Sequence, residues 1–209
     1  MNKSLMISIR PEHAFNILNG KKTLELRTWI PKDYKGWVYV YVTKGKPYLG
    51  KNIDGNYGLY NIPYFGNFNK VGDLNGKVVA RFWFDEFTNY SYHVLMNGDI
   101  EYEEAFDNVD LVEKSCVSFD EIDKYTNFGE KKLYAWHIKK LEIFDKPKDL
   151  SEFYKFKKKW IYSGMDWPPY VDQVKTRLSK APQRSVWVYT KELEKAKENE
   201  KRKGGRKWS

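Results

Sequence analysis

Cysteine and histidine are scarce in this chain of 209 residues, which contains one cysteine and three histidines. A single cysteine, Cys116, forms no intramolecular disulfide and builds no cysteine-based zinc site, as is common in a reducing cytosol. The histidines His13, His93 and His137 are scattered, with none of the short spacings typical of a metal centre. We therefore expect no metal and no cofactor.

Long hydrophobic runs are also lacking. No segment approaches the roughly 20 apolar residues that cross a membrane as a helix. The first residues, MNKSLMISIRPEH, hold too short an apolar stretch for a signal peptide. The sequence thus predicts a cytoplasmic protein that has no membrane partner.

Acidic residues are the minority charge, because 28 Asp and Glu face 37 Lys and Arg, giving a formal charge of +9. Aromatic residues are abundant at 17%, led by 16 tyrosines and 8 tryptophans, whose rings stack and whose edges are polar. A basic, aromatic-rich surface favours a phosphate-bearing partner such as RNA, single-stranded nucleic acid or a nucleotide. The alternative is that the excess charge serves only solubility.

The hydrophobic pattern predicts an α+β fold of short strands and short helices. Strands are expected at 5–10, 22–29, 36–44, 76–87, 133–144 and 181–189, with the third of these central in its sheet. Helices are expected at 11–20, ending at a glycine, and at 119–126, where Ser118 and Glu121 have the spacing of a capping box. Without regular βαβ spacing, these elements favour a mixed β-barrel over a doubly wound sheet.

We expect one domain over residues 1–190, with excursions near 45–70 and 154–170. Residues 90–116 give no clear pattern. From residue 191 the composition changes to KELEKAKENEKRKGGRKWS, which predicts a charged helix and a basic tail over 191–209.

The most informative stretch is GKKTLELR, residues 20–27. Gly20 allows a helix to end in a left-handed turn, and Lys22 at the following corner can curl over the strand. Alternation then directs three polar side chains to one face of that strand, opposite Leu24 and Leu26: Thr23, Glu25 and Arg27. We expect a Lys/Glu/Arg cluster at a recess beside the first helix; the alternative is an exposed ladder of ion pairs.

This stretch resembles the G-x-K-x-x-E-x-R motif of the ASCH family, with Gly20, Lys22, Glu25 and Arg27 at the four defining positions. Further segments are similar to bacterial and phage ASCH proteins, among them CVSFDEIDKY, YAWHIKKLEIFDKPKDLSEF and APQRSVWVY. The resemblance implies a PUA-like mixed β-barrel with short flanking helices, whose cleft binds RNA or a nucleotide. Arg27 would bind a phosphate through two hydrogen bonds, and Lys22 would add a positive charge.

The resemblance also implies an enzymatic alternative. Some ASCH proteins are similar to amidohydrolases of N4-acetylcytidine, and others look like ribonucleases. In such an enzyme Lys22 and Glu25 would be catalytic, with Glu25 as general base. Glu25 stands where the amidohydrolases carry a nucleophilic threonine, and this chain is about twice their length. Two adjacent cations would lower the basicity of Glu25, which favours binding over catalysis.

Aromatic and basic residues outside the motif are further candidates for stacking on bases and holding phosphates. The proposed nucleic-acid-binding set outside the motif comprises Lys44, Tyr57, Tyr60, Trp136, Lys158 and Trp160. The alternatives are a satellite core for the tyrosines, a core position for Trp136 and a solvated helix face for the lysines. His137, beside Trp136, is expected to be a hydrogen-bonded core residue.

The leading hypothesis is an RNA- or nucleotide-binding protein that holds its ligand in a basic cleft. The second is a hydrolase acting on a modified nucleoside or on RNA. A third, from the phage-like resemblance, is a protein that blocks a host defence partner.

Overall fold

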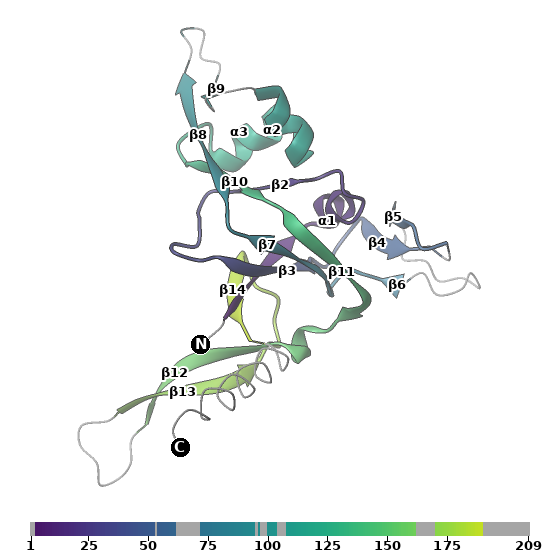
Figure 1. The fold of residues 1–209 in the computed structure, drawn as a ribbon, viewed down its shortest axis with the longest axis vertical. Coiled ribbons are helices and arrows are strands. Elements are labelled where there is room, and N and C mark those ends of the chain that lie inside the picture. The colour runs from purple at the N-terminus through teal and green to yellow at the C-terminus, as the bar shows by residue number, and fades with distance from the viewer. Residues whose placement is uncertain are drawn as a thin grey trace, which may run out of the picture.

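The structure is a computed structural model, shown in Figure 1. It describes residues 3–52, 54–61, 72–94, 96, 100–103, 108–161 and 170–189. The predicted helix and tail over 191–209 lie outside the described residues, as do residues 62–71 of the first excursion.

A five-stranded sheet forms the centre of the molecule. Its order is β11-β7-β3-β1-β14, in which β1 and β3 run parallel and all other neighbours are antiparallel. The strands are β1 (Ser4–Ile9), β3 (Gly36–Val42), β7 (Val78–Phe84), β11 (Lys139–Lys148) and β14 (Ser185–Val188). The predicted central position of β3 is confirmed, and its near-continuous burial fits a strand covered on both faces.

A second sheet has the order β2-β10-β8-β9. Its strands are β2 (Leu24–Arg27), β10 (Leu133–His137), β8 (Phe87–Val94) and β9 (Ile100–Glu103). The chain passes between the two sheets at 85–86 and again at Ile138, so the strand predicted over 133–144 is bent there. The α+β class is confirmed, whereas the described sheets are open and do not close into one continuous barrel.

Short helices cover the sheets: α1 (Pro11–Leu18), α2 (Asn108–Ser115), α3 (Phe119–Thr126) and the 3-10 turn η1 (Leu150–Glu152). Pro11 begins α1, where its missing N–H costs no helical hydrogen bond. The predicted capping box of α3 is present, because the carboxylate of Glu121 accepts hydrogen bonds from the Ser118 amide and hydroxyl. Helices α2 and α3 lie at one end of the molecule (Figure 1).

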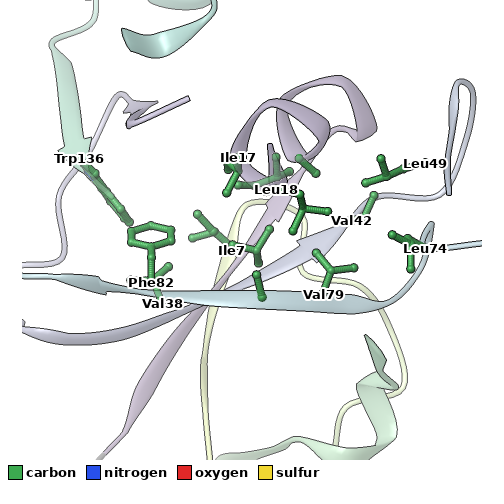
Figure 2. Packing of buried hydrophobic residues seen from close by; sticks show 14 of the residues in the cluster. Ile7, Ile17, Leu18, Val38, Val42, Leu49, Leu74, Val79, Phe82 and Trp136 are labelled. Carbon is green, nitrogen blue, oxygen red and sulfur yellow. The ribbon is translucent and has the colours of Figure 1, made fainter. Parts of the chain in front are cut away.

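The main hydrophobic core lies between α1 and the five-stranded sheet. Figure 2 shows Ile17 and Leu18 of α1 facing Ile7, Val38 and Val79 of the strands. A second core joins Leu24 and Leu26 of β2 to side chains of α2 and α3, namely Leu111 and Ile122. The alternation predicted for β2 is therefore confirmed, because its leucines enter this core and its charged residues face the other way. Each buried aliphatic side chain contributes about 1.5–3 kcal/mol.

The two excursions form small sheets of their own. The first contains β4 (Tyr48–Lys51), β5 (Tyr57–Tyr60) and β6 (Gly72–Asp73), in the order β5-β4-β6. The second is an antiparallel ribbon of β12 (Tyr154–Ile161) and β13 (Tyr170–Arg177), which projects at the end opposite α3 (Figure 1). The lysine-rich run is therefore a strand, not a helix face. Among the described helices, none is long and apolar enough to cross a membrane.

Candidate functional site

A pocket of about 140 Å³ opens where the end of β1, the start of α1, strand β2 and helix α3 meet. Its polar lining consists of Ser8, Arg10, His13, Lys22, Glu25, Arg27 and Glu121. Its apolar lining consists of Ile9, Leu26, Val117, Ile122 and Tyr125. The pocket therefore combines a charged wall from β2 with a largely apolar wall from α3.

The turn after α1 brings the motif into this pocket. Gly20 has a φ of +71°, in the left-handed region that glycine adopts without strain. Its amide donates to the Ile17 carbonyl at 3.0 Å, and the amides of Lys21 and Lys22 both donate to the Asn16 carbonyl. This tight corner reverses the chain within four residues of the helix end, as predicted from Gly20.

Three charged side chains of the motif form a buried triad. Glu25 Oε1 lies 2.9 Å from an Arg27 terminal nitrogen, and Glu25 Oε2 lies 3.5 Å from Lys22 Nζ. Lys22, Glu25 and Arg27 are 2%, 7% and 8% exposed. The predicted cluster is thus recessed, and the alternative of an exposed ion-pair ladder is wrong.

Lys22 is held from two sides. Its Nζ donates to the Ser115 carbonyl at 2.6 Å, in addition to its pairing with Glu25. Burial lowers the pKa of Lys22 from its ordinary value of 10.5, while Glu25 acts in the opposite direction. The end of α2, which supplies Ser115, therefore fixes the lysine against the pocket wall.

Arg27 keeps hydrogen-bonding capacity for a ligand. One terminal nitrogen bonds both Glu25 and the Ser8 carbonyl, the latter at 3.0 Å. Its Nε is buried without a hydrogen-bond partner among the described residues. An unsatisfied buried donor costs about 1–3 kcal/mol, so the fold holds Arg27 in this position at a cost in stability.

Helix α3 supplies the outer wall through residues that share one helical face. Glu121, Ile122 and Tyr125 are spaced three and four residues apart. Hydrogen bonding from the Ser118 backbone lowers the pKa of Glu121, with smaller effects from its hydroxyl, His13 and Arg10. Tyr125 is 42% exposed at the edge of the pocket, so its ring is accessible for stacking.

His13 also lines the pocket, and its Nδ1 is buried without a hydrogen-bond partner among the described residues. Burial lowers the pKa of His13 from 6.5, and the nearby charge of Lys22 lowers it further. Burial thus favours the neutral form of His13. Apart from His13, the charged lining has three cations, from Arg10, Lys22 and Arg27, against two carboxylates, so the pocket is electropositive.

Two further residues proposed from the sequence lie next to the triad but not in the pocket. Thr23 is exposed. Its amide donates to the Lys114 carbonyl, and its carbonyl accepts a hydrogen bond from the Ile138 amide. Trp136 is opposite Glu25 in the β10–β2 ladder but is fully buried, packing on Trp29 and donating its indole N–H to the Trp29 carbonyl. Trp136 is thus a core residue.

Its neighbour His137 is half-buried and shares a hydrogen bond of 2.9 Å with the Thr88 hydroxyl. The predicted hydrogen bond of His137 is confirmed, whereas its predicted core position is not, because the ring is only half-buried.

The remaining candidates lie away from this pocket. Tyr57 packs against the main core and lines a separate cavity beside β4, with Lys51 over its ring at 5.5 Å. Tyr60 is half-buried at the end of β5. Lys44 lines a groove beyond the end of β3. The sequence therefore grouped side chains that the fold separates.

Lys158 and Trp160 occupy strand β12, but their side chains lie outside the described residues. Their predicted contact with nucleic acid stays a prediction. Within the described residues, no group of three or more potential ligands is arranged to hold a metal ion.

Sequence reasoning missed His13, Glu121 and Tyr125 as site residues. A signal for the last two was present, because their spacing in the predicted helix places them on one face with Ile122. His13 lies in the first turn of the predicted helix, immediately after the strand that the motif was expected to approach.

No family model matches this chain, and no curated protein matches it either. Among solved structures it is similar to an ASCH protein from Zymomonas mobilis and to two single-residue mutants of that protein. Each shares 16% identity at a TM-score of 0.47, and covers 94% of this chain and 94–98% of its own. ASCH is also the family whose motif the sequence resembles. A likeness at this level assigns no activity, which must come from the pocket itself.

Proposed function

We propose that this protein binds a nucleotide, either free or as one unit of a single-stranded RNA, in the pocket between β2 and α3. The observation that carries this proposal is the buried Lys22–Glu25–Arg27 triad, which lines an open, electropositive cavity. Burying charges costs several kcal/mol per ion. Apolar residues at the same positions often give a protein that is equally stable or more stable. A charged triad at a cavity wall is therefore better explained by a ligand than by the fold.

Each wall suits one part of a nucleotide. The guanidinium groups of Arg27 and Arg10 can donate to phosphate or to acceptors on a base, and the carboxylate of Glu25 can accept from a base amino group. Ile122, Val117 and the ring of Tyr125 offer an apolar surface on which a base can stack.

The size of the pocket limits what it can hold. Its volume of about 140 Å³ is below the roughly 300–1,000 Å³ of sites that enclose drug-sized ligands. It therefore admits one base or one phosphate, and the rest of a strand must lie outside.

The test uses two aromatic residues on α3 that are equally exposed. Tyr125 lines the pocket, whereas Phe119, also 42% exposed, does not. Calorimetric titration with each of the four ribonucleoside monophosphates should show that Tyr125→Ala weakens binding of the preferred nucleotide by about 5- to 150-fold, equivalent to about 1–3 kcal/mol. Phe119→Ala should bind as the wild type does. Equal affinities for wild type and both variants would refute the proposal.

Arg27→Lys refines the test, because it keeps the charge but removes the planar fork of donors. We expect weaker nucleotide binding in a protein whose circular dichroism spectrum matches that of the wild type. An unchanged affinity would show that Arg27 acts only as a point charge.

One observation favours a hydrolase as the second candidate. The pKa of Lys22 is lowered by burial beside a carboxylate, which is common among catalytic groups. However, Lys22 Nζ is engaged by Ser115 and Glu25, and these contacts favour the charged ammonium over a free base. Wild type and Glu25→Gln should both leave N4-acetylcytidine and labelled RNA intact. Turnover by the wild type that is lost in Glu25→Gln would establish the hydrolase instead.

A further inference from the structure

A groove of about 520 Å³ lies beyond the end of β3, at the base of the β12–β13 ribbon. It is formed by Tyr41 of β3, by Thr43 and Lys44 directly after β3, by the η1 turn, and by residues 178–181 that follow β13. Buried Tyr41 and Leu178 contribute to its apolar lining. Its volume is several times that of the nucleotide pocket, so it can hold more than one unit of an extended ligand.

The groove presents the side chains that contact phosphates. Lys44 and Lys180 are exposed cations, and three hydroxyls accompany them, from Thr43, Ser151 and Ser179. Lysine and hydroxyl side chains are typical partners of a phosphodiester backbone.

The groove has one carboxylate, Asp149, which is paired with Lys77 at 2.6 Å. Repulsion of a polyanion by this carboxylate is therefore reduced. Because the charges of Asp149 and Lys77 balance each other, Lys44 and Lys180 give the groove a net positive charge.

The groove and the nucleotide pocket lie on opposite faces of the β1–β3 pair, both at the end where these parallel strands stop. Ser8 lines the pocket, and its partner in the parallel β1–β3 ladder, Tyr41, lines the groove. The Ser8 hydroxyl donates to the Pro182 carbonyl at 2.5 Å, directly after groove residue Ala181. The Ser8 amide donates to the carbonyl of Arg184, whose exposed position adds a cation at this junction.

We propose that the groove binds the phosphodiester backbone of the nucleotides flanking the one held in the pocket, so that the ligand is a single-stranded RNA several nucleotides long. The inference rests on the proposed function of the pocket. The strand passes from Arg27 and Arg10, over the Ser8–Pro182 junction and Arg184, to Lys180 and Lys44. Backbone contacts give affinity without sequence preference, so the base in the pocket alone provides selectivity.

The experiment compares ligand length. Affinities for the preferred mononucleotide and for RNA oligomers of increasing length are measured by calorimetry and fluorescence anisotropy at several salt concentrations. The groove variant is Lys44→Ala/Lys180→Ala. The control, Lys131→Ala/Lys132→Ala, removes the same charge from two exposed lysines that line neither the pocket nor the groove.

Wild type and control should bind oligomers more tightly than the mononucleotide, and the groove variant should lose most of this gain while binding the mononucleotide unchanged. The slope of log affinity against log salt should fall by about 0.7 for each phosphate that a lysine no longer neutralises, or about 1.4 for the pair. Inorganic polyphosphate of matching charge should bind more weakly than RNA, because it places no base in the pocket.

The proposal is overturned if groove variant and control bind oligomers equally, if oligomers bind no better than the mononucleotide, or if polyphosphate binds as tightly as RNA. Failure of the pocket is a separate result, since it would appear as mononucleotide binding that is absent or insensitive to Tyr125→Ala.

Discussion

Two clusters that each pair a lysine with a carboxylate differ chiefly in their exposure. In the pocket, the side chains of Lys22, Glu25 and Arg27 are at most one-tenth exposed. On the surface, Lys139 Nζ lies 3.1 Å from Asp85 and 2.5 Å from Glu86, and these side chains are one-third to one-half exposed. The distances alone would rank the surface cluster as the tighter.

The pKa shifts of the two lysines have opposite directions. Hydrogen bonding to Glu86 and Asp85 raises the pKa of Lys139, whereas burial lowers that of Lys22. Desolvation thus outweighs attraction in the pocket and is the weaker effect on the surface. The comparison shows that, in a buried triad, each charged side chain depends on the other two. A ligand that contacts one of them therefore affects all three.

The largest effect is expected on removing one member of the buried triad. Lys22→Met leaves Glu25 paired with Arg27 alone and the buried Ser115 carbonyl without its donor. We expect the free energy of unfolding to fall by about 1–3 kcal/mol, as for a buried acceptor left without a hydrogen bond. Urea denaturation followed by circular dichroism measures this. A midpoint equal to that of the wild type would show that solvent reaches the Ser115 carbonyl, contrary to the burial of that residue.

Replacing the whole triad separates stability from function. The variant Lys22→Met/Glu25→Leu/Arg27→Met also replaces the buried Glu25–Arg27 pair by apolar side chains, so we expect it to be about 1–4 kcal/mol more stable than Lys22→Met alone. Nucleotide binding, followed by calorimetry, should nevertheless be lost. Retained binding in this variant would mean that the triad serves the fold and that the ligand site lies elsewhere.

The surface cluster supplies the matched control. Lys139→Met removes the same charge from a solvated site, where exposed ion pairs contribute little. We expect almost no change in the urea midpoint and none in nucleotide affinity. A loss as large as that of Lys22→Met would abolish the distinction between the two clusters.

The smallest effect concerns pH. The folded pKa of His13 lies below 6.5, so between these two values the unfolded chain binds more protons than the folded one. The stability that His13 contributes should therefore be lost as the pH drops from 6.5 through the folded pKa. Below the folded pKa, His13 should cause no further loss. Urea midpoints across pH 5–8 should depend less on pH in His13→Gln. Parallel profiles would assign the pH dependence to other groups.

The sequence predicted the parts of the site that depend on neighbours along the chain. The turn at Gly20, the opposite faces of Leu24 and Glu25, and the capping box at Ser118 all follow from local geometry. Local rules are sufficient for these because each involves residues within four positions.

The parts that depend on distant packing were not predictable. The carbonyl that holds Lys22 is 93 residues away, on Ser115, and the Arg27 guanidinium bonds the backbone of Ser8 in another strand. Trp136 was proposed to stack on a base, with a core position as the alternative, and the structure places it in the core with its indole N–H bonded to the Trp29 carbonyl. The same residue type serves either role, and only tertiary contacts decide which.

The central claim is that the triad-lined pocket holds a nucleotide, and a crystal structure of the protein soaked with its preferred ribonucleoside monophosphate tests it most directly. The prediction is electron density for the base against Tyr125 and Ile122, with a ligand oxygen or ring nitrogen within hydrogen-bond distance of the Arg27 guanidinium. A nucleotide bound at any other surface, with the pocket between β2 and α3 left to water, would contradict it.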